Sequence, residues 1–380
     1  MPAEVDYLYP PYSIQHSDPA GIAGHTVRTD LVHADGHVEY DVHSLFGTAM
    51  SFATYDAMLA RRPGKRPFII TRSTFAGAGR KVGKWLGDNL STWHHYRNSI
   101  SGVLQFAAIY QMPLVGADVC GFGGNTTETL CARWTALGAF APFYRNHNAE
   151  ASTSQEPYRW EIVASAARKA IDIRYSLLDY IYTAMWRQHT TGTPSVSPLW
   201  FAYPKDPATW SLDLQYLYGP SLLVSPVTAE NATSVAVYLP NDVWYDYHTL
   251  KRAAPGATTL HGVAFDEIPL FLKGGSIVPR RRSAGCMTVA AVRERDFELV
   301  VVPARDGAAA GELYLDDGES LQQPAITHVV FRYTRGLLAA TGTFEYPTSL
   351  SVVAITVLTE DGPRTEKVRL GLDGAFEVKV

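Results

Sequence analysis

Polar and charged side chains follow four successive strand-like segments in the first half of the chain. Arg72 follows "FIIT", Asp88 follows "KWLG", Asp118 follows "LVGA", and Arg145 to His147 follow "APFY". In a parallel barrel the C-terminal ends of the strands converge on one face, and such enzymes keep their chemistry on that face. We therefore expect these side chains to share one pocket.

A pocket of this composition suits carbohydrate chemistry. Hydrolysis of a glycosidic bond needs a carboxylic acid that protonates the leaving oxygen and a second carboxylate that acts as nucleophile or base. Arg72 and His147 would donate hydrogen bonds to sugar hydroxyls, and Trp85 or Phe122 would provide an apolar wall for the sugar ring. The residues therefore favour a glycoside hydrolase with an uncharged substrate.

Each of these residues also has an interpretation without catalysis. Arg72 would serve as a structural ion-pair partner, and Asp118 would cap the turn that follows it. His147 would be a hydrogen-bonded core histidine. Asp88, which lies between a glycine and an asparagine, resembles an aspartate of a tight turn. The common pocket is favoured because it explains all four positions together.

The sequence gives no sign of a metal or cofactor. No His/Cys cluster has the spacing of metal ligands, and no G-x-G-x-x-G or P-loop pattern follows a strand. The acidic segment "LYLDDGES" contains Asp316, Asp317 and Glu319, but its spacing does not follow an EF-hand loop. We expect a hairpin turn at "DDG" and no cofactor.

Composition limits the partners of the chain. A formal net charge of -4 over 380 residues provides no basic field of the kind that attracts nucleic acid. No run approaches the roughly 18 apolar residues of a membrane span, and the N-terminal residues lack the basic and apolar regions of a signal peptide. We expect no nucleic-acid or membrane partner and a small-molecule substrate.

The spacing of apolar residues predicts the elements that must position the pocket. Strand-like segments alternate with helical segments, which indicates parallel βαβ units. The predicted helices cover residues 44–62, 92–110, 126–140 and, as one long helix, 159–188. The predicted strands cover residues 66–71, 82–88, 113–118 and 141–146.

After about residue 192 the sequence changes to short β-rich runs separated by Pro, Gly and Asp. This pattern of short runs predicts antiparallel sheets. From about residue 285, "RDFELVVVPA" and "GELYLDDGESL" predict an array of hairpins. We expect an α/β region over 1–192 and two all-β domains, resembling β-sandwiches, over 193–284 and 285–380.

Four long segments together closely resemble the α-glucosidases of glycoside hydrolase family 31. They are "RPFIITRSTFAGAGR", "WLGDN", "VGADVCGFGGNTTETLCARWTALGAFAPFYRNHN" and "GELYLDDGES". The segments "YPPYSI" and "HADGHVEYDVHSLFG" are most similar to the secreted fungal type. The resemblance implies a (β/α)8 TIM barrel, of which residues 1–192 would form the C-terminal half, and release of terminal α-linked glucose from maltose, maltooligosaccharides or starch.

The resemblance also implies a role for each matching residue. Asp88 in "WLGDN" matches the family's general acid/base. Three residues match groups that hold sugar hydroxyls in the −1 subsite, and two match its apolar lining. The former are Arg72, Asp118 and His147, and the latter are Trp85 and Phe122.

Further positions follow from the same comparison. Cys120 and Cys131 match a pair that is commonly disulfide-bonded beside the pocket, which would leave Cys286 free. Lys84 departs from the family pattern, in which a histidine usually precedes this tryptophan. The N-x-Ser/Thr patterns at Asn125 and Asn231, and a third at Asn89, are glycosylation candidates.

A larger departure concerns the second carboxylate. The family's nucleophile is an aspartate in a W-I-D-M-N-E-like segment upstream of "YPPY", and no W-I-D-x-N-E pattern occurs in the 380 residues. We therefore expect the C-terminal part of an α-glucosidase, with an N-terminal half in a separate chain or in missing sequence. Activity of this chain alone should be absent or very weak.

Two alternatives remain. The chain would be a non-catalytic sugar-binding remnant, in which no partner revives hydrolysis. Or the complete enzyme would have another specificity of the family, such as α-xylosidase or α-glucan lyase activity.

Overall fold

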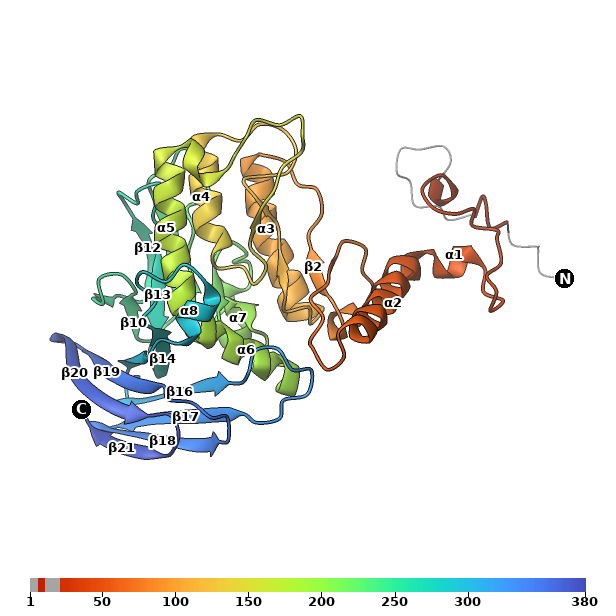
Figure 1. The fold of residues 1–380 in the computed structure, drawn as a ribbon. Coiled ribbons are helices and arrows are strands. Elements are labelled where there is room, and N and C mark those ends of the chain that lie inside the picture. The colour runs from red at the N-terminus through yellow and green to blue at the C-terminus, as the bar shows by residue number, and fades with distance from the viewer. Residues whose placement is uncertain (1–5, 11–20) are drawn as a thin grey trace.

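The computed structural model of the chain describes residues 6–10 and 21–380. Residues 11–14 of the "YPPYSI" segment lie outside the described residues. In Figure 1 the segment that carries α1 extends away from the remaining elements, and the sheet that contains β16 to β21 lies at the C-terminal end. The helices are α1 (Glu39–Val42), α2 (Phe46–Arg61), α3 (Trp93–Leu104), α4 (Glu128–Gly138), α5 (Glu161–Ser176), α6 (Leu178–Thr191), α7 (Leu199–Ala202) and α8 (Val289–Arg293).

Short parallel strands lie between these helices. Strands β1 (Ile70–Thr71), β2 (Gly83–Trp85) and β3 (Val115–Gly116) form a sheet in that order. Strand β4 (Asp118–Val119) pairs in parallel with β5 (Arg145–Asn146), with Asp118 opposite Arg145. The parallel βαβ units predicted from the sequence are confirmed. The last strand, predicted over 141–146, is confined to its final two residues, Arg145 and Asn146.

The predicted single helix over 159–188 is wrong. Helix α5 ends at Ser176, and α6 begins at Leu178. The intervening Leu177 has φ −100° and ψ 7°, which departs from helical geometry. The new helix places Asp179 in its first turn, where a buried guanidinium binds it as described below.

Antiparallel strands follow the helices, as predicted. A six-stranded sheet has the order β11-β10-β13-β8-β7-β6, and β9 pairs with β12. The strands of these sheets are β6 (Val196–Pro198), β7 (Tyr216–Tyr218), β8 (Leu222–Val224), β9 (Val235–Leu239), β10 (Trp244–Asp246), β11 (Arg252–Ala253), β12 (Gly256–Leu260) and β13 (Leu270–Lys273).

The last sheet has eight strands in the order β20-β19-β15-β14-β16-β17-β18-β21. Strands β15 and β16 do not pair with each other, because β14 lies between them and pairs with both. Instead β16 pairs antiparallel with β17, and "DDG" lies in their connection. The strands are β14 (Ser276–Arg281), β15 (Phe297–Val302), β16 (Ala308–Leu315), β17 (Thr327–Thr334), β18 (Leu337–Phe344), β19 (Ser351–Thr359), β20 (Gly362–Gly371) and β21 (Phe376–Lys379).

Strand β14 lies inside the 193–284 range, yet it belongs to this last sheet. The division into three domains at residues 192 and 284 stays a prediction. No helix among residues 6–10 and 21–380 is both long and apolar enough to cross a membrane.

Alternate residues of the eight-stranded sheet face two different cores. Val278 and Val300 belong to the core that the helices share with the six-stranded sheet. Their neighbours Ile277 and Leu299 belong to a second core. Successive side chains of a strand point to opposite faces, so the sheet packs against the helical part with one face and keeps its own core on the other.

A buried ion pair fixes the helical part to this sheet. The Arg281 side chain is 1% exposed, its Nε donates to Asp179 Oδ2 at 2.6 Å, and its Nη2 donates to Asp179 Oδ1 at 2.9 Å. The remaining nitrogen, Nη1, donates to the carbonyls of Arg293 and Arg295. The guanidinium is therefore fully paired, as a buried charge requires.

We predict that Arg281→Ala lowers the free energy of unfolding by about 3 to 5 kcal/mol, because it leaves the Asp179 carboxylate buried without a counter-ion. Urea unfolding measures the change. The matched control is Arg282→Ala, whose guanidinium is 63% exposed and lies 3.3 Å from Glu298, and which should cost less than about 1 kcal/mol. Equal losses in the two variants would contradict the structural role of the buried pair.

Candidate active site

Asp88 lies at an exposed position just beyond the end of β2. Gly87 precedes it with φ +91°, and a Cβ at residue 87 would lie 3.2 Å from the Arg72 Nε. The positive φ favours glycine here, because other L-residues rarely adopt this backbone conformation. The Asp88 side chain is 44% exposed, and its Oδ2 lies 3.5 Å from Arg72 Nη1. The structure thus brings Arg72 and Asp88 together, with the carboxylate accessible to solvent.

Asp118 has the opposite environment, since it is 0% exposed. Arg145 Nε donates to its Oδ1 at 2.8 Å, and a second bond to the same oxygen comes from Arg145 Nη2. Trp85 Nε1 donates to Oδ2 at 3.0 Å. Burial raises the pKa of Asp118 above its usual value, although Arg145 and Trp85 act against this effect. Both oxygens of this carboxylate are used within the protein.

The indole of Trp85 lies near two guanidinium groups. The Arg72 Cζ lies 5.6 Å from the centroid of the ring and the Arg145 Cζ lies 5.2 Å from it, which are cation–π distances. Lys84, the residue that departs from the family pattern, donates from Nζ to the backbone carbonyl of Arg72. Burial, and secondarily Arg72, lower the pKa of Lys84. Lys84 therefore supports the segment that carries Arg72.

Phe122 and His147 lie together on the loops beyond β4 and β5. Their ring centroids are 5.3 Å apart, and His147 is exposed. The six predicted site residues therefore form contacting groups: Arg72 with Asp88 and Trp85, Trp85 with Asp118, and Phe122 with His147. Their roles toward a substrate stay predictions.

Asn89 joins these groups, and the sequence did not identify it as a site residue. Its Nδ2 donates to the Asp118 carbonyl at 2.9 Å, and its Oδ1 accepts the Phe122 N–H at 2.9 Å. It is 8% exposed, so the glycosylation pattern that begins at Asn89 is not accessible to a glycan. The sequence feature that could have identified Asn89 as a site residue is its position next to Asp88 in "GDN".

Arg145 and Gln155 were missed in the same way. Arg145 was noted as a polar residue of a strand end, but its pairing with Asp118 depends on the register of β4 and β5. Gln155 is 1% exposed, and its Nε2 donates to the carbonyls of Val119 and Gly121. Gln155 lies in a loop, and no sequence pattern marks it.

A disulfide between Cys120 and Cys131 joins the loop after β4 to α4. Cys286 is a free cysteine. Asn125 and Asn231 are exposed, and their glycosylation stays a prediction.

Comparison with known proteins identifies two matching family models. The Glycosyl hydrolases family 31 TIM-barrel domain matches residues 13–184, and the Glycosyl hydrolase family 31 C-terminal domain matches residues 192–278. These matches confirm the predicted fold class, with barrel units followed by antiparallel sheets.

Several relatives share sequence over most of this chain. The chain is 50% identical over 364 residues to a "Probable alpha/beta-glucosidase agdC" from Aspergillus fumigatus, which covers 95% of this chain and 41% of that protein. It is 45% identical over 315 residues to a "Probable alpha-glucosidase" from Oryza sativa subsp. japonica, which covers 82% of this chain and 35% of that protein. The chain thus spans less than half the length of these relatives.

Solved structures also match most of this chain and less than half of their own length. The ER glucosidase II heterodimeric complex, formed by a catalytic subunit and the binding domain of a regulatory subunit, matches with TM-score 0.85 and 30% identity, over 93% of this chain and 44% of that chain. A family 31 α-xylosidase from Xanthomonas citri matches with TM-score 0.80 and 25% identity, over 94% of this chain and 42% of that chain.

We predict that Arg145→Met lowers the free energy of unfolding at pH 7 by about 3 to 5 kcal/mol, because it removes the cation that pairs with the buried Asp118 carboxylate. The matched control is Arg72→Met, whose partner Asp88 is exposed and which should cost less than about 1 kcal/mol. Chemical denaturation of both variants measures the two losses.

The decrease in the free energy of unfolding that Arg145→Met causes should become smaller as the pH falls. Without the cation, the folded-state pKa of Asp118 rises further above its unfolded value, so that the penalty exists only when the carboxyl is ionised. Lowering the pH through the folded-state pKa protonates Asp118 and removes the penalty. A loss that stays the same from pH 7 to pH 5 would show that the buried charge is not its cause.

Proposed function

Since the chain belongs to glycoside hydrolase family 31, we propose that it is the part of a retaining α-glucosidase that carries the acid/base catalyst, Asp88. One observation supports this assignment above the others. Of the two aspartates of the candidate site, Asp88 is exposed and lies beside Arg72, whereas Asp118 is buried with both oxygens bonded. Only Asp88 is placed to exchange a proton with a substrate.

The proposed reaction has two steps. In the first, the Asp88 carboxyl donates its proton to the glycosidic oxygen while the bond from that oxygen to the anomeric carbon breaks, and a second carboxylate bonds to that carbon. In the second, the Asp88 carboxylate takes a proton from water, which attacks the anomeric carbon and releases the second carboxylate. The products are an alcohol and a sugar of unchanged anomeric configuration.

The second carboxylate is proposed to come from residues that are not in this chain. Three observations support this proposal. The chain spans 41% of the Aspergillus fumigatus relative, and no W-I-D-x-N-E pattern occurs in its sequence. Large apolar side chains of α2 and the segment before β1 are also exposed, at 63% for Phe46, 60% for Met50 and 67% for Phe68. Phe46 and Met50 lie one turn apart on the same face of α2, and an exposed apolar face is typical of a surface that another element covers.

The proposed substrate is a terminal α-linked glucose residue. The names of the Aspergillus and Oryza relatives, α/β-glucosidase and α-glucosidase, support this choice. An α-xylosidase is the second candidate, because the Xanthomonas citri structure carries that activity in its name. The two sugars differ by the C6 hydroxymethyl group, so a panel of nitrophenyl α-glucoside and α-xyloside distinguishes them.

We predict that this chain, mixed with the N-terminal part of a related enzyme, hydrolyses maltose, and that Asp88→Asn lowers the rate by about 10² to 10⁴. The amide keeps the shape of the carboxylate but provides neither the proton nor the base. The matched control is Asp213→Asn, at an exposed position outside the pocket, which should leave the rate unchanged. Release of glucose measures all three proteins.

A second measurement tests the base role directly. With an α-glucosyl fluoride, whose leaving group needs little acid assistance, Asp88→Ala should form the glycosyl intermediate and then stall. Azide needs no base, so it should restore turnover and give the α-glucosyl azide. Full activity of Asp88→Asn would disprove the assignment. A folded, associated and inactive mixture would instead support the non-catalytic remnant.

A further inference from the structure

Gln155 lies on the loop between β5 and α5 and is almost completely buried, with 1% of its surface exposed. Its Nε2 lies 3.1 to 3.4 Å from four oxygens, which are the carbonyls of Val119, Gly121 and His147 and the Oδ1 of Asn146. Backbone carbonyls only accept hydrogen bonds, so the nitrogen end of the amide must face them. Neither a carboxylate nor an apolar side chain of the same shape can therefore replace Gln155.

Two of these carbonyls flank a turn with an uncommon backbone conformation. Cys120, which lies between Val119 and Gly121, has φ +74°, and Gly121 has φ +93°. A positive φ is uncommon for a residue other than glycine, and such a conformation persists only where its surroundings hold it. The bonds from Gln155 on both sides of Cys120, together with the disulfide to Cys131, hold this turn.

The peptide group between Gly121 and Phe122 is held at both ends by buried side-chain amides. Gln155 Nε2 donates to its carbonyl at 3.1 Å, and Asn89 Oδ1 accepts its N–H at 2.9 Å. Because a peptide group is planar, these two bonds fix its orientation. They thereby fix the direction in which the Phe122 side chain leaves the backbone.

The same nitrogen also binds the loop that carries His147. Gln155 Nε2 lies 3.4 Å from the His147 carbonyl and 3.1 Å from Asn146 Oδ1, and Asn146 Nδ2 donates back to the Gln155 carbonyl at 3.0 Å. The ring centroids of Phe122 and His147 are 5.3 Å apart. One buried amide thus sets the spacing of two loops that each carry a predicted substrate-binding residue.

We propose that Gln155 is a positioning residue of the active site, which keeps Phe122 and His147 at the distance that sugar binding requires. This inference rests on the proposed function, because it needs both rings to contact the substrate. A glutamine that only satisfied buried carbonyls would contribute to stability alone. A positioning residue contributes to substrate binding as well. The Asp88 carboxylate belongs to a different group of contacts, with Arg72, so the proton transfer should depend less on Gln155.

The test is Gln155→Met in the mixture of this chain with the N-terminal part of a related enzyme. The KM for maltose should rise by about tenfold or more, whereas kcat should change by less than about threefold, because binding contacts are lost and the acid/base is kept. Asp88→Asn should do the reverse and lower kcat.

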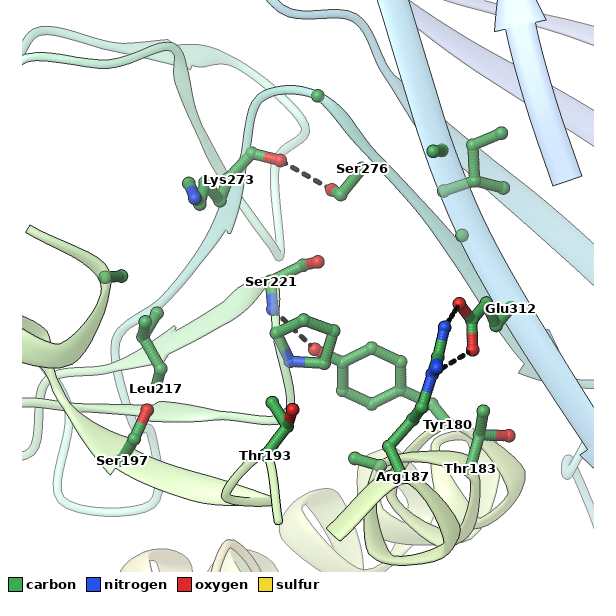
Figure 2. Close-up of a pocket in the computed structure, with 18 of the residues that line it drawn as sticks. Tyr180, Thr183, Arg187, Thr193, Ser197, Leu217, Ser221, Lys273, Ser276 and Glu312 are labelled. Carbon is green, nitrogen blue, oxygen red and sulfur yellow. Dashed lines mark hydrogen bonds and ion pairs between the residues drawn. The ribbon is translucent and has the colours of Figure 1, made fainter. Parts of the chain in front are cut away.

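Gln188→Met is the matched control. Gln188 is also a buried glutamine, at 5% exposed, and its Nε2 donates to the Ala107 carbonyl at 2.6 Å. It follows Arg187 on α6, and Figure 2 shows Arg187 at the wall of a cavity whose lining includes none of the six predicted site residues. Gln188→Met should lower the urea midpoint, as Gln155→Met does, but it should leave KM unchanged.

A second measurement needs no reaction and uses the 380-residue chain alone. The NMR signal of the His147 Cε1–H, assigned by its disappearance in His147→Gln, should shift in Gln155→Met. Its chemical shift depends on the position of the neighbouring Phe122 ring, which Gln155 holds. The signal should stay in place in Gln188→Met.

Asn125→Ala provides a milder variant in case Gln155→Met does not fold. Asn125 is exposed, and its Oδ1 accepts the Thr153 N–H at 2.7 Å, which is another bond between the same two loops. Asn125→Ala should raise KM by about threefold. Asn125→Asp keeps the acceptor and should leave KM unchanged.

An unchanged KM and an unchanged His147 signal in Gln155→Met would overturn the inference, and so would an equal increase of KM in Gln188→Met. The two proposals fail separately. An inactive mixture of the unmodified chain contradicts the proposed function, and the His147 signal then still tests whether Gln155 holds the two loops. An active mixture whose KM does not depend on Gln155 contradicts the positioning role alone.

Discussion

The buried carboxylate of Asp118 is the constraint on which the candidate active site depends. A carboxylate that is removed from water is stable only with a counter-ion and hydrogen bonds. Arg145 of β5 and Trp85 of β2 provide them, so three strand ends are held at fixed spacing around one group. The backbone of the same residue accepts from Asn89, which follows Asp88. The position of Asp88 is thus set by a network centred on its buried neighbour.

The two aspartates therefore divide two tasks that one residue could not perform. Asp118 orients side chains because its oxygens are permanently bonded, and burial raises its pKa. Asp88 is exposed and follows Gly87, whose positive φ favours glycine. A group that gives and then recovers a proton must reach its substrate, and a group that positions others must not move. This contrast, more than the presence of two carboxylates, supports the assignment of Asp88.

Much of this site could be predicted from the sequence because it depends on local order along the chain. Polar residues after buried strands converge wherever those strands are parallel, and this placed Arg72, Asp88 and Asp118 on one face. Contacts that depend on register or on a long-range partner could not be predicted. The bonds of Arg145 require β4 and β5 to pair at that offset, and Gln155 acts from a loop without any pattern. The break at Leu177 was missed because the apolar period continues across it.

The same distinction explains why the eight-stranded sheet was predicted only in outline. Strand β14 inserts between β15 and β16, and no local signal reports such a pairing. Side chains along α6 form hydrogen bonds with this sheet and with its loops. The pairs are Asp179 with Arg281, Tyr182 with Asp316, and Arg187 with Glu312. Arg66, a few residues before Arg72, also bonds to Tyr182. Helix α6 is therefore connected by a direct contact to the segment that leads into β1 and Arg72.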